Sequence, residues 1–227
     1  MQDTRNASPL FVLIACIFVS CLLISNIIAG KLITVYGIVL PGAVILFPVV
    51  YIVGDVLTEV YGFQKARLVI WAGFLCNLIM VAAFYLVLAI PSPDFFTGDS
   101  AFTLVLGMTP RIVLASLLAY WAGEFANSMV LSKLKVFTEG RFLWMRTIGS
   151  TLVGQCLDTF IFIAISFWGT VPNAVLGQMM LYQYLFKVTF EVVATPLTYA
   201  VVGWLKRTEQ MDAFDEGISY NPFKLNA

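Results

Sequence analysis

Six long runs of apolar residues, joined by short polar connections, constrain the fold of this chain more than any other feature. They cover residues 9–30, 42–62, 66–90, 110–132, 145–168 and 174–205. A helix needs about 20 mostly apolar residues to cross the hydrocarbon of a bilayer. Only helices and closed barrels can cross, because lipid offers no partner to backbone polar groups. The runs are too long for barrel strands, so the sequence predicts an all-α integral membrane protein with six transmembrane helices.

The last apolar stretch, 174–205, is too long for one untilted helix. We divide it into a short helix at the outer surface near 174–180 and a sixth transmembrane helix that begins near Leu181. The segment 31–41 is rich in β-branched residues, and we expect it to form a small hairpin or cap at the outer surface.

The chain is therefore expected to consist of one six-helix transmembrane domain, residues 1–207, followed by a polar cytoplasmic tail, residues 208–227. We expect this tail to be frayed, because it lacks a long apolar run. Both a monomer and a homodimer are compatible with the pattern, and the surrounding lipid is a partner in either case.

Composition excludes most soluble functions. Apolar residues make up 60% of the chain and charged residues 11%, whereas a soluble domain is about 25% charged. The net charge is zero, so no basic surface is expected to bind nucleic acid. There is no histidine, and Cys16, Cys21, Cys76 and Cys156 lie in apolar runs, where we expect small buried side chains. We therefore expect no metal site and no cofactor.

Lysine and arginine residues predict the orientation, because they gather in cytoplasmic connections. Two connections and the chain ends carry most of them: Arg5, Lys65, Arg67, Lys133, Lys135, Arg141, Arg146, Lys206, Arg207 and Lys224. The remaining connections carry only Lys31 and Arg111. This alternation predicts a multi-pass membrane protein with both termini in the cytoplasm, and the family resemblance described below implies the bacterial inner membrane.

Charged residues inside the apolar runs indicate a functional site. An isolated charge at the bilayer centre costs about 3 kcal/mol, so such residues pair, take up a proton or face a polar cavity. Spacings of three or four residues place polar groups on shared helix faces. The groups are Asp55 with Glu59, Glu124 with Asn127, Gln155 with Asp158, and Lys187 with Glu191 and Tyr184. We therefore expect a shared cavity for a substrate or an ion.

Some of these residues also have a purely structural interpretation. Asn26 and Asn77 are explained equally well by hydrogen bonds between helices, which are common in membrane proteins. Lys187 and Glu191, four residues apart, could form an ion pair with no further role.

Glu59 lies near the predicted cytoplasmic end of its helix, where it could pair with Lys65. Ala115, Ala119 and Gly123 form a ridge of small residues, which allows two helices to approach closely. We interpret this ridge as tight packing within the chain rather than as a dimer surface.

Several short motifs together resemble one known family. They are Ser25-Asn26, the stretch GDVLTEVYG at 54–62 with Ala66-Arg67, the stretch QCLD at 155–158 with Phe162 and Phe167-Trp168-Gly169, and Tyr184 with Lys187. Over nearly the whole chain they resemble the queuosine precursor transporters of the vitamin uptake transporter family. The Asp-x-x-Thr-Glu-x-Tyr-Gly stretch is the most specific part. Some relatives carry Asn in place of Gln155, so the contact made at this position stays open.

The resemblance implies import of 7-deazaguanine precursors of the tRNA base queuosine, by alternating access around a site near the bilayer midplane. These precursors are 7-cyano-7-deazaguanine and its aminomethyl relative. A carboxylate can accept both N–H donors of a guanine-like edge, and Asp158 is the first candidate for this contact. Gln155 or Asn127 could donate to O6, and Tyr184 or Phe162 could stack on the ring.

Lys187 completes the candidate binding residues. Asp55, Glu59, Glu124 and Glu191 are candidates for coupling or gating, because a carboxylate in a dry cavity can take up and release a proton. Facilitated diffusion, followed by enzymatic trapping of the substrate, would need none of them.

Other functions remain as alternatives. The chain could be the substrate-binding subunit of an ATP-driven vitamin importer, but the Ala-x-x-x-Ala docking motif of those subunits is absent from residues 13–19. It could also transport another small heterocyclic vitamin. An enzyme is not expected, because no glycine-rich phosphate loop or nucleophile motif is present. A channel is disfavoured because the buried charges are of both signs.

Overall fold

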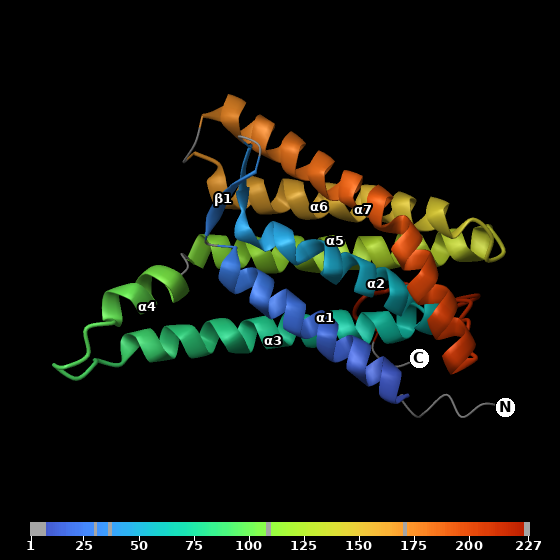
Figure 1. Cartoon of the computed structure of the whole chain (residues 1–227), viewed down its shortest axis with the longest axis horizontal. Coiled ribbons are helices and arrows are strands. Elements are labelled where there is room, and N and C mark those ends of the chain that lie inside the picture. The colour runs from blue at the N-terminus through green and yellow to red at the C-terminus, as the bar shows by residue number, and fades with distance from the viewer. Residues whose placement is uncertain (1–7, 30, 36–37, 108–109, 170–171, 225–227) are drawn as a thin grey trace.

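The structure, a computed structural model, describes residues 8–29, 31–35, 38–107, 110–169 and 172–224. Within these ranges the chain forms seven α-helices and one antiparallel hairpin (Figure 1). The elements are α1 (Pro9–Ile28), β1 (Leu32–Val35), β2 (Ile38–Pro41), the 3-10 turn η1 (Gly42–Ile45), α2 (Phe47–Tyr61), α3 (Phe63–Ala89), α4 (Asp99–Leu106), α5 (Pro110–Phe137), α6 (Leu143–Phe167) and α7 (Asn173–Glu209).

Four of these helices, namely α1, α3, α6 and α7, are long and apolar enough to cross a membrane. The chain is therefore a multi-pass membrane protein. The short α2, with 15 residues, and α5, with 28, are not among the four. The prediction of six crossings and of two cytoplasmic termini thus stays a prediction.

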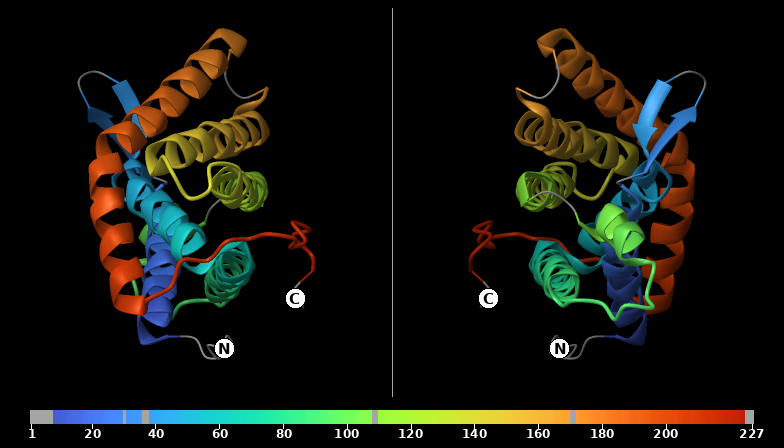
Figure 2. Two further views of the ribbon diagram at one scale, coloured as in Figure 1. Left: turned by 90° about the vertical axis from the view of Figure 1, so that its right-hand side faces the viewer. Right: turned by 90° about the vertical axis from the view of Figure 1, so that its left-hand side faces the viewer.

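The hairpin expected within 31–41 is present as β1 and β2. The division of the last apolar stretch is wrong, because 174–180 and the following residues belong to one continuous helix of 37 residues. Its length of about 55 Å exceeds the hydrocarbon thickness of about 30 Å, so the helix extends beyond a bilayer instead of breaking. Figure 2 shows that α7 changes direction along its course. Pro196 lies inside it, and proline removes a backbone hydrogen bond and bends a helix.

Helix α2 lies at the centre of the bundle, in contact with α1, α3, α5 and α7. Figures 1 and 2 both show it enclosed by these longer helices. Most of its residues are buried, including Asp55 and Glu59. The motif that gave the family resemblance therefore forms the core of the molecule.

Helices α5 and α6 pack closely through small residues. A Cβ atom on Gly154 would lie 2.7 Å from the Cβ of Asn127, and one on Gly123 would lie 2.8 Å from the Cβ of Asp158. Ala115 and Ala119, on the same ridge, are buried within the chain. The interpretation of this ridge as intramolecular packing is confirmed. The close approach places Asn127 and Asp158 at the contact between the two helices.

The C-terminal tail packs against the bundle, so the expectation of a frayed tail is wrong. The Asp215 carboxylate accepts a hydrogen bond from the Phe63 backbone N–H, at 2.8 Å, and thereby caps the N-terminus of α3. Arg67 donates to the carbonyl oxygens of Ser219 and Asn221. Polar residues late in the chain thus close the end of the molecule where α2 meets α3.

The cysteines only partly follow the expectation. All four are free thiols, but Cys16 and Cys156 are exposed on the outside of the bundle and Cys21 and Cys76 are half-buried. In a bundle surrounded by lipid, an apolar side chain needs no burial within the protein.

Candidate functional site

A small pocket, with free space for about one water molecule, lies between the beginning of α2 and the middle of α6 and α7. The lining residues are Val44, Phe47, Pro48, Tyr51, Thr151, Gln155, Phe186, Lys187, Phe190 and Glu191. The pocket therefore combines aromatic walls with a few buried polar groups, as ligand pockets generally do.

An ion pair between α6 and α7 borders this pocket. Lys187 Nζ lies 2.5 Å from Asp158 Oδ2, and the side chains are 4% and 16% exposed. The same ammonium lies 4.7 Å from the centre of the Phe47 ring and 5.6 Å from that of Tyr51. Lys187 is thus held by a carboxylate and two aromatic faces. Lys187 pairs with Asp158 and not, as the spacing had suggested, with Glu191.

Three residues of the pocket have polar atoms without hydrogen-bond partners. Both amide atoms of Gln155 are buried and unpaired, as are Thr151 Oγ1 and Glu191 Oε1. Buried polar groups are nearly always paired in folded proteins, so an unpaired group indicates water, an ion or a ligand. Three such residues around one pocket indicate that its natural occupant is polar.

A second polar group lies deeper, where α2 meets α5. Asn127 Nδ2 donates to Asp55 Oδ1 at 2.6 Å, and both residues are buried. Asp55 Oδ2, Asn127 Oδ1 and Glu124 Oε2 have no partner. Gly54 provides the space for Glu124, whose Oε2 would lie 3.2 Å from a Cβ at that position. The structure thus brings together the predicted residues Asp55, Asn127 and Glu124, but outside the lining of the pocket.

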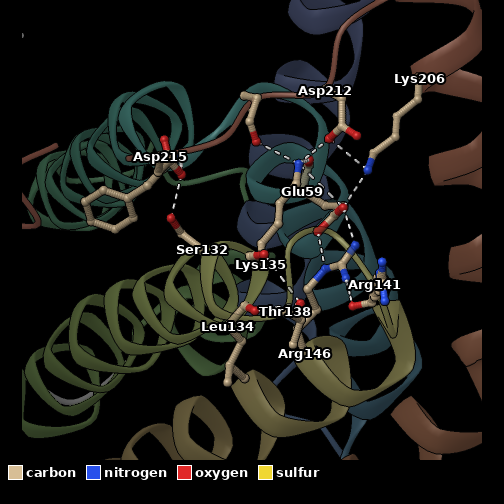
Figure 3. Close-up of polar contacts among 12 residues, drawn as sticks. Glu59, Ser132, Leu134, Lys135, Thr138, Arg141, Arg146, Lys206, Asp212 and Asp215 are labelled. Carbon is tan, nitrogen blue, oxygen red and sulfur yellow. Dashed lines mark hydrogen bonds and ion pairs between the residues drawn. The ribbon is translucent and has the colours of Figure 1, made fainter. Parts of the chain in front are cut away.

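Glu59 lies one turn beyond Asp55 along α2, in a cluster of charges (Figure 3). Arg146 donates to both of its carboxylate oxygens, at 2.6 and 2.7 Å, and Lys206 donates to Oε1 at 2.6 Å. Lys135 Nζ lies 3.6 Å from Oε1 and also donates to the Glu59 backbone carbonyl. The suggested pair of Glu59 with Lys65 is wrong, because the Lys65 ammonium instead lies over aromatic rings of α1 and α2.

The tail contributes Asp212 to this charge cluster. Its carboxylate accepts from Lys135 and lies 2.9 Å from Lys206 Nζ. Partial burial would raise the pKa of Asp212, but hydrogen bonds from Lys135 and Lys206 outweigh burial and hold the pKa below its usual value. The cluster of Glu59, Lys135, Arg146, Lys206 and Asp212 ties α2, α5, α6, α7 and the tail together at one end of the bundle.

Asn26 and Asn77 lie in a different place. Asn26 Nδ2 donates to Asn77 Oδ1 at 2.5 Å, and Ser116 donates to Asn26 Oδ1 at 2.9 Å. The side-chain amide of Asn77 donates to the backbone carbonyl of Gly73. These bonds join α1, α3 and α5, and they fit the interpretation of both residues as contacts between helices.

Two predicted aromatic residues do not line the pocket. The Tyr184 hydroxyl donates to the Leu152 carbonyl at 3.3 Å, and the Phe162 ring packs edge-on against Phe167. The aromatic residues at the pocket are instead Phe47, Tyr51, Phe186 and Phe190.

Sequence reasoning missed Tyr51 and Arg146 as site residues. Tyr51 is one turn before Asp55 on the same helix, and this spacing was the available signal. Arg146 was used only to assign orientation, although an arginine at the edge of an apolar run needs a buried partner.

Comparison with known proteins gives an independent result. The family model described as "Putative vitamin uptake transporter" matches residues 41–201, which extend from the end of β2 into α7. A Bacillus subtilis protein named "Probable queuosine precursor transporter" is 29% identical over 187 residues, which are 82% of each chain. An Escherichia coli protein named "Queuosine precursor transporter" is 28% identical over 164 residues, 69% of each chain. No solved structure matches the chain.

Proposed function

We propose that this chain, which belongs to the vitamin uptake transporter family, imports queuosine precursors across the bacterial inner membrane for salvage into tRNA. The names of its relatives in Bacillus subtilis and Escherichia coli support this substrate class. The observation that carries the proposal is the pocket with unpaired Gln155, Thr151 and Glu191. The chemistry of this lining, aromatic walls with unpaired polar atoms, suits a planar, polar bicycle better than an ion or a lipid, and the pocket has to widen to admit it. A transport role also requires no catalytic group.

The proposed orientation places six helices across the membrane, with both termini in the cytoplasm. The start of α1, the α2–α3 junction, the α5–α6 turn and the end of α7 lie at one end of the molecule in Figure 1, and the basic residues gather there. The hairpin and α4 lie toward the other end. An impermeant maleimide added to intact cells should then label a cysteine placed at Asp94, but not one placed at Glu216.

The charge cluster around Glu59 supports transport by alternating access. Pocket and cluster lie at different levels of α2, since Tyr51 and Glu59 are eight residues, or about 12 Å, apart. We assign the cluster as a closed cytoplasmic gate, whose ion pairs separate when the pocket opens inward. The deeper carboxylates Asp55 and Glu124 lie between the two and are the candidates for coupling to a proton.

The experiment measures queuosine in the tRNA of bacteria that can neither make nor import the precursor. Cells expressing this chain and given nanomolar 7-cyano-7-deazaguanine should regain queuosine. Asp158→Asn should reduce this recovery at least tenfold, because it leaves the Lys187 ammonium buried without its carboxylate. The exchanged pair, Asp158→Lys with Lys187→Asp, restores the charge balance and should recover part of the activity.

Two outcomes distinguish the alternatives. A well-expressed wild-type chain that restores no queuosine would contradict autonomous import and favour the substrate-binding subunit of an ATP-driven importer or another vitamin as substrate. Full activity of Asp158→Asn would support the import function but show that substrate passage does not depend on the ion pair.

A further inference from the structure

The pocket presents a defined set of unpaired hydrogen-bonding atoms. Gln155 offers an N–H donor at Nε2 and an acceptor at Oε1, and Glu191 offers an acceptor at Oε1. The two side chains are 1% and 2% exposed, so bulk water is not their partner. Both line the same pocket, Gln155 from α6 and Glu191 from α7.

We infer that Gln155 and Glu191 together select a guanine-type base edge. This edge presents an acceptor at O6, a donor at N1–H and a donor at the exocyclic 2-amine. Gln155 Nε2 donates to O6, Gln155 Oε1 accepts from N1–H, and Glu191 Oε1 accepts from the 2-amine. The inference rests on the proposed import function and names the residues that set its specificity.

Asp158, the first candidate from the sequence, is less suited to this contact. Its carboxylate is already paired with Lys187 at 2.5 Å, and Lys187 is also held over Phe47 and Tyr51. A base bound by Asp158 would compete with Lys187 for the carboxylate oxygens, and Asp158 is not among the residues that line the pocket. Gln155 and Glu191 line the pocket and have buried polar atoms that no hydrogen bond uses. Lys187 and Asp158 are therefore positioning residues that fix the wall of the pocket.

The chemistry of Glu191 accounts for discrimination among purine-like bases. The free oxygen of Glu191 accepts a hydrogen bond from an N–H group of the ligand, whereas a C–H at the same place offers none. A hypoxanthine-type base lacks the 2-amine, and an adenine-type base has a C–H at this position. Either base would leave Glu191 Oε1 without the partner that the 2-amine supplies, and a site built to hydrogen-bond a ligand group rejects the analogue that lacks this group.

The test compares two competitors of labelled 7-cyano-7-deazaguanine uptake. The first is unlabelled 7-cyano-7-deazaguanine, and the second is the same molecule without its 2-amine. For the wild-type chain the second should inhibit about tenfold more weakly or worse, which corresponds to the loss of about one hydrogen bond. Glu191→Met should bring the two inhibition constants together. Inhibition by unlabelled 7-cyano-7-deazaguanine should become weaker, and inhibition by the molecule without the 2-amine should stay nearly unchanged.

Matched variants separate recognition from folding. Glu191→Gln retains the size of the side chain and should reduce the ratio of the inhibition constants partially, even if Glu191→Met does not fold. Gln155→Leu should weaken inhibition by both competitors to the same extent, because both carry O6 and N1–H. Asp94→Asn neutralises an exposed carboxylate outside the pocket lining and outside the proposed coupling and gate residues, and it should leave the ratio unchanged.

The outcomes distinguish this inference from the import function. Uptake by a wild-type chain that does not discriminate between the competitors would overturn the inference and leave import intact. Equal weakening of both competitors by the Glu191 variants would also overturn it. Absence of any uptake by the wild-type chain would instead contradict the proposed function.

Discussion

Glu59 shows how a single buried carboxylate organises one end of the molecule. It is fully buried, and Arg146, Lys135 and Lys206 surround it with three positive charges from three other helices. Asp212 supplies a second negative charge from the tail. Removing one partner from a buried ion network is costly, because the remaining charges stay desolvated.

Glu59→Gln should therefore destabilise the detergent-solubilised protein by about 3 kcal/mol. Thermal unfolding in one detergent, followed by fluorescence-detected size exclusion, measures the effect. Asp212→Asn is the matched control: its carboxylate is 44% exposed, and its loss should cost less than about 1 kcal/mol. Equal unfolding temperatures for Glu59→Gln and wild type would show that the charge cluster contributes no stability.

The control also has a predicted pH dependence. The pKa of Asp212 is held below its usual value of about 3.9 in the folded protein. The contribution of its carboxylate to the free energy of unfolding is therefore complete above about pH 3.9 and is lost as the pH falls through the lowered pKa. The small difference between wild type and Asp212→Asn should thus persist at pH 5–8 and disappear on acidification below about pH 4.

At the scale of helices, the contact between α5 and α6 determines where the polar residues meet. Gly123 and Gly154 allow the backbones to approach, and this approach places Asp158 beside α5 and Asn127 beside α6. Helix α2 then lies against this pair and adds Tyr51 and Asp55.

Gly154→Ala should lower stability by about 1–3 kcal/mol, because the added Cβ would lie 2.7 Å from that of Asn127 and force the helices apart. The transport rate of this variant should fall together with its stability. Gly203→Ala on α7 is the matched control, since a Cβ there meets nothing within 4 Å. That variant should unfold at the wild-type temperature or slightly above it, because alanine favours a helix more than glycine does. Identical melting of both variants would refute the close packing of α5 and α6.

The sequence predicted most helices because their apolar runs are long and end at glycine, proline or charge. It failed for α7, whose continuity depends on protruding beyond a bilayer, and for α4, which is too short to give a clear apolar run. It also identified the buried charges but not their partners. Spacing along α7 relates Lys187 to Glu191, whereas the partner in space, Asp158, comes from α6. The choice of partner is a tertiary property and leaves no local signal.

For the whole molecule, the central claim is that this chain alone moves a 7-deazaguanine through the pocket formed by α2, α6 and α7. The pocket lies on one side of the deep carboxylates and the charge cluster on the other. From this arrangement we propose a transporter that is closed at the end of the charge cluster and works without an ATPase subunit.

Uptake of labelled 7-cyano-7-deazaguanine into proteoliposomes that contain only this purified chain tests the claim most directly. We predict saturable uptake, inhibited by an excess of unlabelled substrate and reduced at least tenfold by Gln155→Leu. Liposomes without protein provide the baseline, and Gly203→Ala, which is far from any side-chain contact, should retain the wild-type rate. Absence of uptake by folded, monodisperse protein, or equal uptake by wild type and Gln155→Leu, would contradict the account.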